Sequence, residues 1–192
     1  MYIDRILAPI EALGPGKRLV IWTAGCTKHC KGCANPELWS TAGAKNISVS
    51  DRARIAENSK RNTDYTGITI SGGDPLEQRE EILELLEKLK KIADDILVNT
   101  GYVLEDIEKE WFAEDVERLK SKVSVLIDGP YIAEFNTPEA VLRGSANQRL
   151  IFFDRQYEKA YEAYMKEGRK IQNVYMGSRL VSVGIHNRGG EQ

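Results

Sequence analysis

The clearest pattern of hydrophobic and polar positions in the chain lies between Leu76 and Ile92. Apolar residues recur there three or four positions apart, with Glu and Lys between them, which is the spacing of one apolar helix face. The segment is therefore predicted to be an amphipathic helix. Its apolar face comprises Ile82, Leu85, Leu86, Leu89 and Ile92.

Short apolar runs bounded by turn residues predict the strands. The first is expected at 18–23, and the others at 67–70, 96–98, 123–127, 150–153, 171–175 and 180–183. Helices are expected between them, from an N-cap at Ser48 or Ser50 to about Ser59, and over 102–111, 113–121 and about 156–166. A short helical turn is expected to begin at Pro36.

Strands that alternate with helices predict right-handed β-α-β units and a parallel sheet, which is an α/β fold. About six units are expected, fewer than the eight of a closed barrel. No repeat, low-complexity tract or linker interrupts the sequence, so residues 1–192 are expected to form a single domain. Sites in such folds collect where strands end, which directs attention to residues 26–33, 71–74, 99–102 and 128–131.

The composition, with 42% hydrophobic and 29% charged residues, is that of a globular protein, and the chain can bury a sizeable core. The net charge of −2 predicts no strong attraction to nucleic acid or to an anionic membrane. No apolar run reaches membrane-spanning length, and the polar start of the chain does not resemble a signal peptide. A cytoplasmic location is therefore expected.

All three cysteines lie in the segment 25–33, with the spacing C-x3-C-x2-C. An odd number of cysteines in one short cluster argues against a disulfide framework. Three thiolates can converge on one metal centre, yet they are one ligand short of a closed four-ligand site. The open position indicates chemistry at the metal. The alternative is a structural zinc site completed by His29, in a module that binds a protein partner; three unrelated buried cysteines are less expected.

This cysteine loop resembles that of the radical S-adenosylmethionine (SAM) enzymes. Gly32 stands where that superfamily often has an aromatic residue, a departure shared with the activating proteins of anaerobic ribonucleotide reductase. The following segment, Asn-Pro-Glu-Leu-Trp at 35–39, also resembles that branch. The resemblance implies a partial (β/α)6 barrel of the radical SAM type. It also implies a [4Fe–4S] cluster with Cys26, Cys30 and Cys33 as its metal ligands, and SAM chelating the fourth iron.

Four further segments resemble known motifs. One is similar to radical SAM enzymes in general, and three are similar to the same activating proteins. Ser-Gly-Gly-Asp-Pro at 71–75 resembles the superfamily's Gly-Gly-Glu-Pro segment, which receives the amino group of SAM. The other three are Asn-Thr-Gly-Tyr at 99–102, Asp-Gly-Pro-Tyr at 128–131 and Arg-Gly-Ser-Ala-Asn-Gln-Arg at 143–149. Taken alone, each could be a turn or a solvated loop, with Asp74 favoured by the dipole of the helix that follows.

The resemblance implies a set of cofactor-binding residues, namely Gly32, Ser71, Gly72, Gly73, Asp74, Thr100, Asp128 and Asn147. Arg149 is a further candidate because a guanidinium offers a bidentate pair of donors. His186 is expected to be a surface residue. No side chain stands out as a general acid or base, and no catalytic residue of that kind is predicted.

The function that the resemblance implies is that of an oxidoreductase working under anaerobic conditions. It would cleave SAM reductively to a 5′-deoxyadenosyl radical and install a glycyl radical on a partner enzyme, above all the anaerobic ribonucleoside-triphosphate reductase. A flavodoxin- or ferredoxin-type protein would supply electrons, and neither nucleic acid nor a membrane would take part. One alternative is a small radical SAM enzyme acting on a peptide or metabolite; the zinc-binding interaction module is the other.

Overall fold

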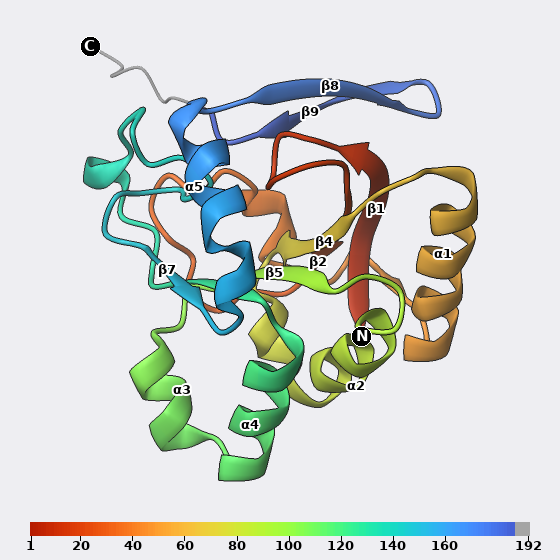
Figure 1. Cartoon of the computed structure of the whole chain (residues 1–192), viewed down its shortest axis with the longest axis horizontal. Helices are drawn as coiled ribbons and strands as arrows, with labels where there is room; N and C mark the ends of the chain where they lie inside the picture. The colour runs from red at the N-terminus through yellow and green to blue at the C-terminus, as the bar shows by residue number, and fades with distance from the viewer. Residues whose placement is uncertain (187–192) are drawn as a thin grey trace.

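The computed structural model describes residues 1–186, and within them the strands form a seven-stranded sheet and a separate hairpin (Figure 1). The sheet order is β3-β1-β2-β4-β5-β6-β7. Its strands are β1 (Tyr2–Ile10), β2 (Arg18–Thr23), β3 (Lys45–Asn46), β4 (Gly67–Gly72), β5 (Asp95–Asn99), β6 (Val125–Asp128) and β7 (Arg149–Phe152). The hairpin pairs β8 (Ile171–Met176) with β9 (Arg179–Gly184). The helices are α1 (Val49–Asn62), α2 (Arg79–Leu89), α3 (Leu104–Glu110), α4 (Ala113–Lys122) and α5 (Glu158–Lys166).

The prediction of an α/β fold is confirmed, but the predicted number of parallel strands is wrong. Four neighbouring strands, β2, β4, β5 and β6, are parallel, whereas β1 and β7 join the two sides of this group in antiparallel pairing. Strand β1 was not predicted, so 18–23 is the second strand rather than the first. Strands β8 and β9 are joined by Gly177 and Ser178 alone, and a two-residue connection makes a hairpin rather than a crossover.

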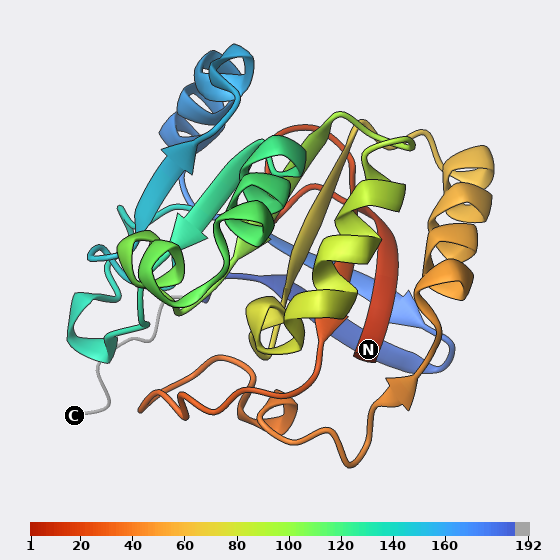
Figure 2. The same ribbon diagram turned by 90° about the horizontal axis from the view of Figure 1, so that it is seen from below.

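Two layers cover the sheet on opposite sides (Figures 1 and 2). Helices α1, α2 and α4 pack on one face, over a core that includes Leu19, Ile21 and Ile70. On the other face, α5 covers Leu97, and the β8–β9 hairpin covers Trp22. Of the apolar face predicted for α2, Ile82, Leu85, Leu86 and Leu89 are buried, whereas Ile92 lies beyond the end of the helix and is half-buried. Ser48 is the N-cap of α1, its hydroxyl accepting a hydrogen bond from the Asp51 backbone. None of the helices within residues 1–186 has the length and apolar character needed to cross a lipid bilayer.

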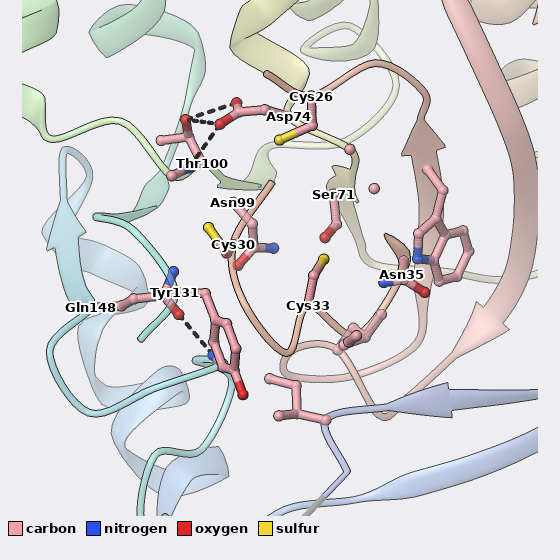
Figure 3. Close-up of a pocket in the computed structure, with 18 of the residues that line it drawn as sticks. Cys26, Cys30, Cys33, Asn35, Ser71, Asp74, Asn99, Thr100, Tyr131 and Gln148 are labelled. Atoms are coloured by element: carbon pink, nitrogen blue, oxygen red, sulfur yellow. Dashed lines mark hydrogen bonds between the residues drawn. The ribbon is translucent and has the colours of Figure 1, made fainter. Parts of the chain in front are cut away.

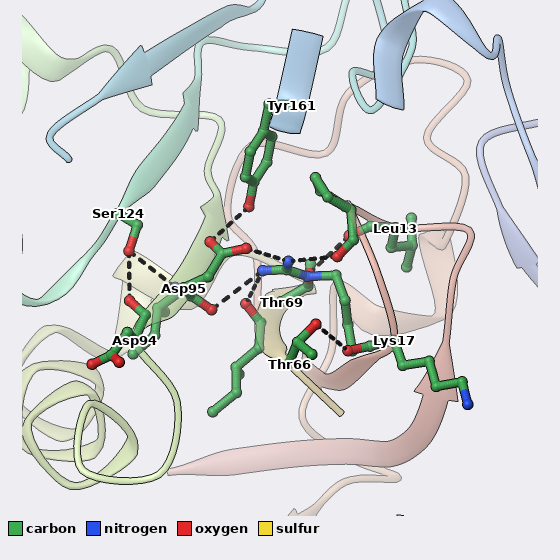
Figure 4. Close-up of polar contacts among 12 residues, drawn as sticks. Leu13, Lys17, Thr66, Thr69, Asp94, Asp95, Ser124 and Tyr161 are labelled. Atoms are coloured by element: carbon green, nitrogen blue, oxygen red, sulfur yellow. Dashed lines mark hydrogen bonds and ion pairs between the residues drawn. The ribbon is translucent and has the colours of Figure 1, made fainter. Parts of the chain in front are cut away.

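A buried polar network ties the strands together near their amino ends (Figure 4). The Arg18 guanidinium forms an ion pair with Asp95 at 2.6 Å and donates to the Thr69 hydroxyl at 2.6 Å. The Tyr161 hydroxyl of α5 donates to the same Asp95 carboxylate at 2.9 Å. Gly14 lies against Arg18, and a Cβ at this glycine would lie 2.6 Å from the arginine side chain. Because this network lies near the amino ends of the strands, a functional site is expected at the opposite edge, where the parallel strands have their carboxyl ends.

Candidate functional site

A pocket of about 460 Å³ opens at the carboxyl ends of the parallel strands (Figure 3). Its lining comes from the loop after β2, the ends of β4 and β5, the connection between β6 and β7, and the end of β9. Segments far apart in the chain therefore meet at one cavity, as the rule for parallel strands predicts.

The three cysteines line this pocket, and their sulfur atoms point toward it (Figure 3). The loop that carries them is anchored by backbone hydrogen bonds from Gly25 to Leu38 at 2.9 Å and from Cys26 to Trp39 at 3.1 Å. The acceptors belong to the 3₁₀ turn Pro36–Leu38 and to its C-cap Trp39, at the position predicted for a helical turn. Three thiols facing one cavity are a donor set that fits a [4Fe–4S] cluster with one open iron.

His29 takes no part in this lining. Its backbone is left-handed, with φ of 44°, and its ring stacks on Trp39 with centroids 4.7 Å apart. Within residues 1–186 no group of three His, Cys, Asp or Glu side chains lies so that it could hold a single metal ion. The His29 ring thus contacts Trp39 and is not among the groups that line the pocket with the three thiols.

Gly72 ends β4 and Gly73 follows it, and these glycines let the end of the strand pack against the cysteine loop. Gly73 donates to the Thr23 carbonyl at 2.8 Å, and Asp74 donates to the Gly25 carbonyl at 2.9 Å. A Cβ at Gly73 would lie 2.4 Å from the Gly25 oxygen and 2.8 Å from the Leu38 oxygen. The close approach at Gly73 is thus to the protein's own backbone, and the glycine is required to hold the cysteine loop in place.

Asp74 is almost completely buried, and its carboxylate joins three segments. It accepts hydrogen bonds from the Thr100 hydroxyl at 2.8 Å, from the Gly101 backbone at 2.9 Å and from the Leu76 backbone at 3.1 Å. The Lys28 ammonium lies 3.4 Å from the carboxylate. Burial raises the pKa of Asp74, although Lys28 and the hydrogen bonds act in the opposite direction. The carboxylate has few acceptor sites left for a ligand.

Lys28 and Glu77 contribute contacts that the sequence reasoning missed. Glu77 accepts from the Thr27 hydroxyl at 2.6 Å, and the Lys28 ammonium lies 3.7 Å from Glu77 and 3.0 Å from the centre of the Tyr102 ring. Burial raises the pKa of Tyr102 to about 12. These contacts bind the cysteine loop to the segments that follow β4 and β5. The sequence signal for this contact was the spacing of Glu77, which follows Asp74 by three residues and so lies one turn further along the segment that follows β4.

Asp128 and Arg149 form the last pair of the β6–β7 ladder. The Arg149 guanidinium donates to Asp128 at 2.9 Å and to Glu105 at 2.8 Å, and the Leu104 backbone donates to Asp128 at 2.8 Å. The hydrogen bond from Arg149 lowers the pKa of Glu105 to about 2. Asp128, although fully buried, therefore has its partners within the protein and does not line the pocket.

The segments 128–131 and 143–149 continue this pairing beyond the strands. The Gln148 amide donates to the Gly129 carbonyl at 2.8 Å, and its oxygen accepts from the Gly144 backbone at 2.8 Å. The Asn147 amide donates to the Pro130 carbonyl at 2.8 Å. The side chains that resemble a family motif are thus used to hold one wall of the pocket together.

The predicted site residues fall into two groups. Those that line the pocket are Cys26, Cys30, Cys33, Gly32, Ser71, Gly72, Gly73, Asp74 and Thr100. Asp128, Asn147 and Arg149 are not among the residues that line it. His186 is exposed, as predicted, and lies at the rim of the pocket. Arg5 of β1 also lines the pocket and was missed because β1 was missed.

Comparison with known proteins defines the class to which this pocket belongs. Residues 12–151 match the family model described as a 4Fe-4S single cluster domain. The chain is therefore a member of that iron–sulfur family, and the matched residues include the cysteine loop.

The relatives narrow the class further. The chain is 37% identical over 140 residues to a protein of Haemophilus influenzae (70% of this chain, 87% of the relative) and 37% identical over 155 residues to one of Enterobacteria phage T4 (78% and 93%). It is 29% identical over 146 residues to a protein of Escherichia coli (73% and 92%). All three are named anaerobic ribonucleoside-triphosphate reductase-activating protein. The chain belongs to this family of radical SAM activating enzymes, and its cofactors are a [4Fe–4S] cluster and SAM.

Proposed function

We propose that this protein activates an anaerobic ribonucleoside-triphosphate reductase by installing a glycyl radical on it. The observation that carries the proposal is the pocket in which all three cysteines and the Gly-Gly-Asp segment meet, in a chain that belongs to the activating-protein family. When bound, the cluster and SAM supply a 5′-deoxyadenosyl radical by one-electron cleavage of SAM.

The chain's own residues bind and orient the reactants. Cys26, Cys30 and Cys33 would hold three irons of the cluster, and the backbone of residues 71–73, which lines the same pocket, would bind SAM. Asp74 acts mainly by positioning Thr100 and Lys28 around the cofactor, because its carboxylate is already hydrogen-bonded within the protein. No side chain need move a proton in the hydrogen abstraction, so the pocket's work is to orient the reactants and exclude water.

The remaining predicted cofactor residues have an indirect role in this proposal. Asp128 and Asn147 do not line the pocket, whereas Tyr131 does. Asn147 donates to the Pro130 carbonyl next to Tyr131, and Asp128, at the end of the strand that leads into this turn, is bonded to Arg149. They support the cofactor pocket by fixing that wall. Gly32 allows the backbone turn between Cys30 and Cys33, with φ of 76°.

The electron donor, the cellular setting and the fold type belong to the same proposal. The electron donor is a flavodoxin- or ferredoxin-type protein, the setting is anaerobic, and the location is cytoplasmic, with neither nucleic acid nor a membrane as a partner. The fold is a partial barrel of the radical SAM type in a single domain, supported by the four adjacent parallel strands whose carboxyl ends meet at the pocket.

Electron paramagnetic resonance tests the proposal. Reconstituted, reduced protein is mixed with SAM and the reductase of the same organism under strict anaerobiosis, and a glycyl-radical doublet is expected. Deuterium at the reductase's radical-site glycine should appear in 5′-deoxyadenosine. The Cys30→Ala variant is the control and should give neither signal.

The outcomes separate the alternatives. If the protein cleaves SAM yet yields no doublet with the reductase, the substrate is a different peptide or a metabolite. Colourless protein that holds zinc and no iron or sulfide after anaerobic purification would refute the radical chemistry altogether.

A further inference from the structure

One part of the pocket is built by two segments that lie outside the cysteine loop, the connection that carries Tyr131 and the end of β9. We call it the hairpin rim, and its members are Tyr131, Asn136, Leu142 and residues 182–186. Figure 3 shows Tyr131 on the side of the cavity away from Asp74 and Thr100. The family model matches only residues 12–151, so the hairpin half of this rim lies beyond the matched segment.

A single guanidinium joins the two halves of the hairpin rim. Arg169 donates to the Asn136 side-chain oxygen at 2.7 Å and to the His186 carbonyl at 3.3 Å. It also donates to the carbonyls of Ala140 at 3.3 Å and Arg143 at 3.4 Å. A planar fork with five donors can hold several acceptors in one geometry, which an ammonium group cannot do.

The same contacts extend to Tyr131. The Asn136 amide donates to the Tyr131 hydroxyl at 3.2 Å, while its oxygen accepts from Arg169. A Cβ at Gly144 would lie 2.9 Å from the Tyr131 ring, so this glycine admits the ring at that position. Arg169 thereby sets the relation between the Tyr131 wall and the end of β9.

The hairpin rim carries no Lys, Arg, Asp or Glu. Within residues 1–186 the charged residues that line the pocket are Arg5, Lys28 and Asp74, which belong to β1, the cysteine loop and the end of β4. A phosphorylated metabolite would call for cations at the place where it binds. The groups that line the rim are aromatic, aliphatic, amide, hydroxyl and imidazole, and the Arg169 guanidinium is bonded to acceptors of the protein itself. Such a lining suits an extended stretch of polypeptide instead.

We propose that the hairpin rim receives the glycine-containing segment of the reductase and that Arg169 is its positioning residue. This inference rests on the proposed function, because it names the part of the pocket that recognises the protein substrate. It assigns partner selection to the β8–β9 hairpin and the 131–144 connection, and cofactor chemistry to the cysteine side.

The test separates recognition of the reductase from SAM chemistry. Arg169→Ala and Arg169→Lys are compared with the wild type for SAM cleavage without the reductase and for the reductase KM in glycyl-radical formation. Loss of the fork should raise this KM about tenfold, as expected for one to two lost hydrogen bonds. SAM cleavage in the absence of the reductase should stay within about twofold of wild type, since the cysteine side is untouched. Lys should not rescue, because it keeps the charge and lacks the fork.

Two further variants complete the design. Arg155→Ala removes an exposed arginine that does not line the pocket and should leave both measurements unchanged. Asn136→Ala breaks the link to Tyr131 while Arg169 keeps its carbonyl acceptors; it should raise the KM too, and it carries the test if Arg169→Ala does not fold.

Two results would overturn the inference while leaving the proposed function standing. One is an unchanged KM in both Arg169→Ala and Asn136→Ala. The other is a parallel loss of SAM cleavage and radical formation, which would mean that Arg169 supports the whole pocket. A wild type that cleaves SAM and yields no glycyl radical would refute the proposed function itself, and the inference with it.

Discussion

Replacing Asp74 by Ala is the most direct test of how the site is held together. The substitution removes the acceptor of the Gly101 and Leu76 backbone N–H groups and of the Thr100 hydroxyl, in a place that is only 1% exposed. It also leaves Lys28 with Glu77 as its remaining acidic neighbour among the described residues. Three segments around the pocket lose their common partner at once.

The expected loss of stability follows from these contacts. Each stranded buried N–H costs about 1–3 kcal/mol, so the two together cost about 2–6 kcal/mol. The Thr100 hydroxyl can rotate to another acceptor and adds little. Burial raises the pKa of Asp74, which means that the charged carboxylate is itself costly to bury, and its removal returns part of the loss. The net destabilisation should therefore lie in the lower half of that range, about 3 kcal/mol.

Urea unfolding of the cluster-free protein under reducing conditions measures this quantity. A loss of about 3 kcal/mol corresponds to a melting temperature lower by about 6–12 °C for a chain of this size. Asp94→Ala is the matched control, because Asp94 is exposed, and it should change the unfolding free energy by less than about 0.5 kcal/mol. A loss below about 1 kcal/mol for Asp74→Ala would refute the argument that its hydrogen bonds hold the site.

Three other outcomes are expected. Gly73→Ala should lower cluster content as well as SAM affinity, measured by iron and sulfide analysis, because its Cβ would meet the cysteine-loop backbone; a full cluster would contradict this. The Glu105 carboxyl should titrate near pH 2 by NMR and return toward 4.5 in Arg149→Gln. Its stabilising contact is thus present above the ordinary pKa and lost as the pH falls toward 2. Arg18→Met should cost about 3–5 kcal/mol in urea unfolding, because it leaves the buried Asp95 without its cation. A loss below about 1 kcal/mol, which is close to the effect of a surface substitution, would contradict this expectation.

The sequence by itself determined most of the elements and the chemistry of the site. The apolar spacing of α2, the runs that form β2, β4 and β5, and the N-cap at Ser48 depend on neighbours within a few residues, so local pattern is sufficient. The cysteine spacing is likewise local, and it directed attention to the correct edge of the sheet because parallel strands gather their carboxyl ends there.

Only the tertiary structure decided what each motif contacts. Gly73 faces the carbonyl of Gly25, and His29 stacks on Trp39 and does not line the pocket. The carboxylate of Asp128 is paired with Arg149, which lies 21 residues further along the chain. Strand β1 extends the sheet and the separate β8–β9 hairpin lines the pocket, through pairings that no local spacing specifies. The free energy of such contacts depends on which distant residues the folded chain brings within hydrogen-bonding distance, and a linear pattern does not contain that information.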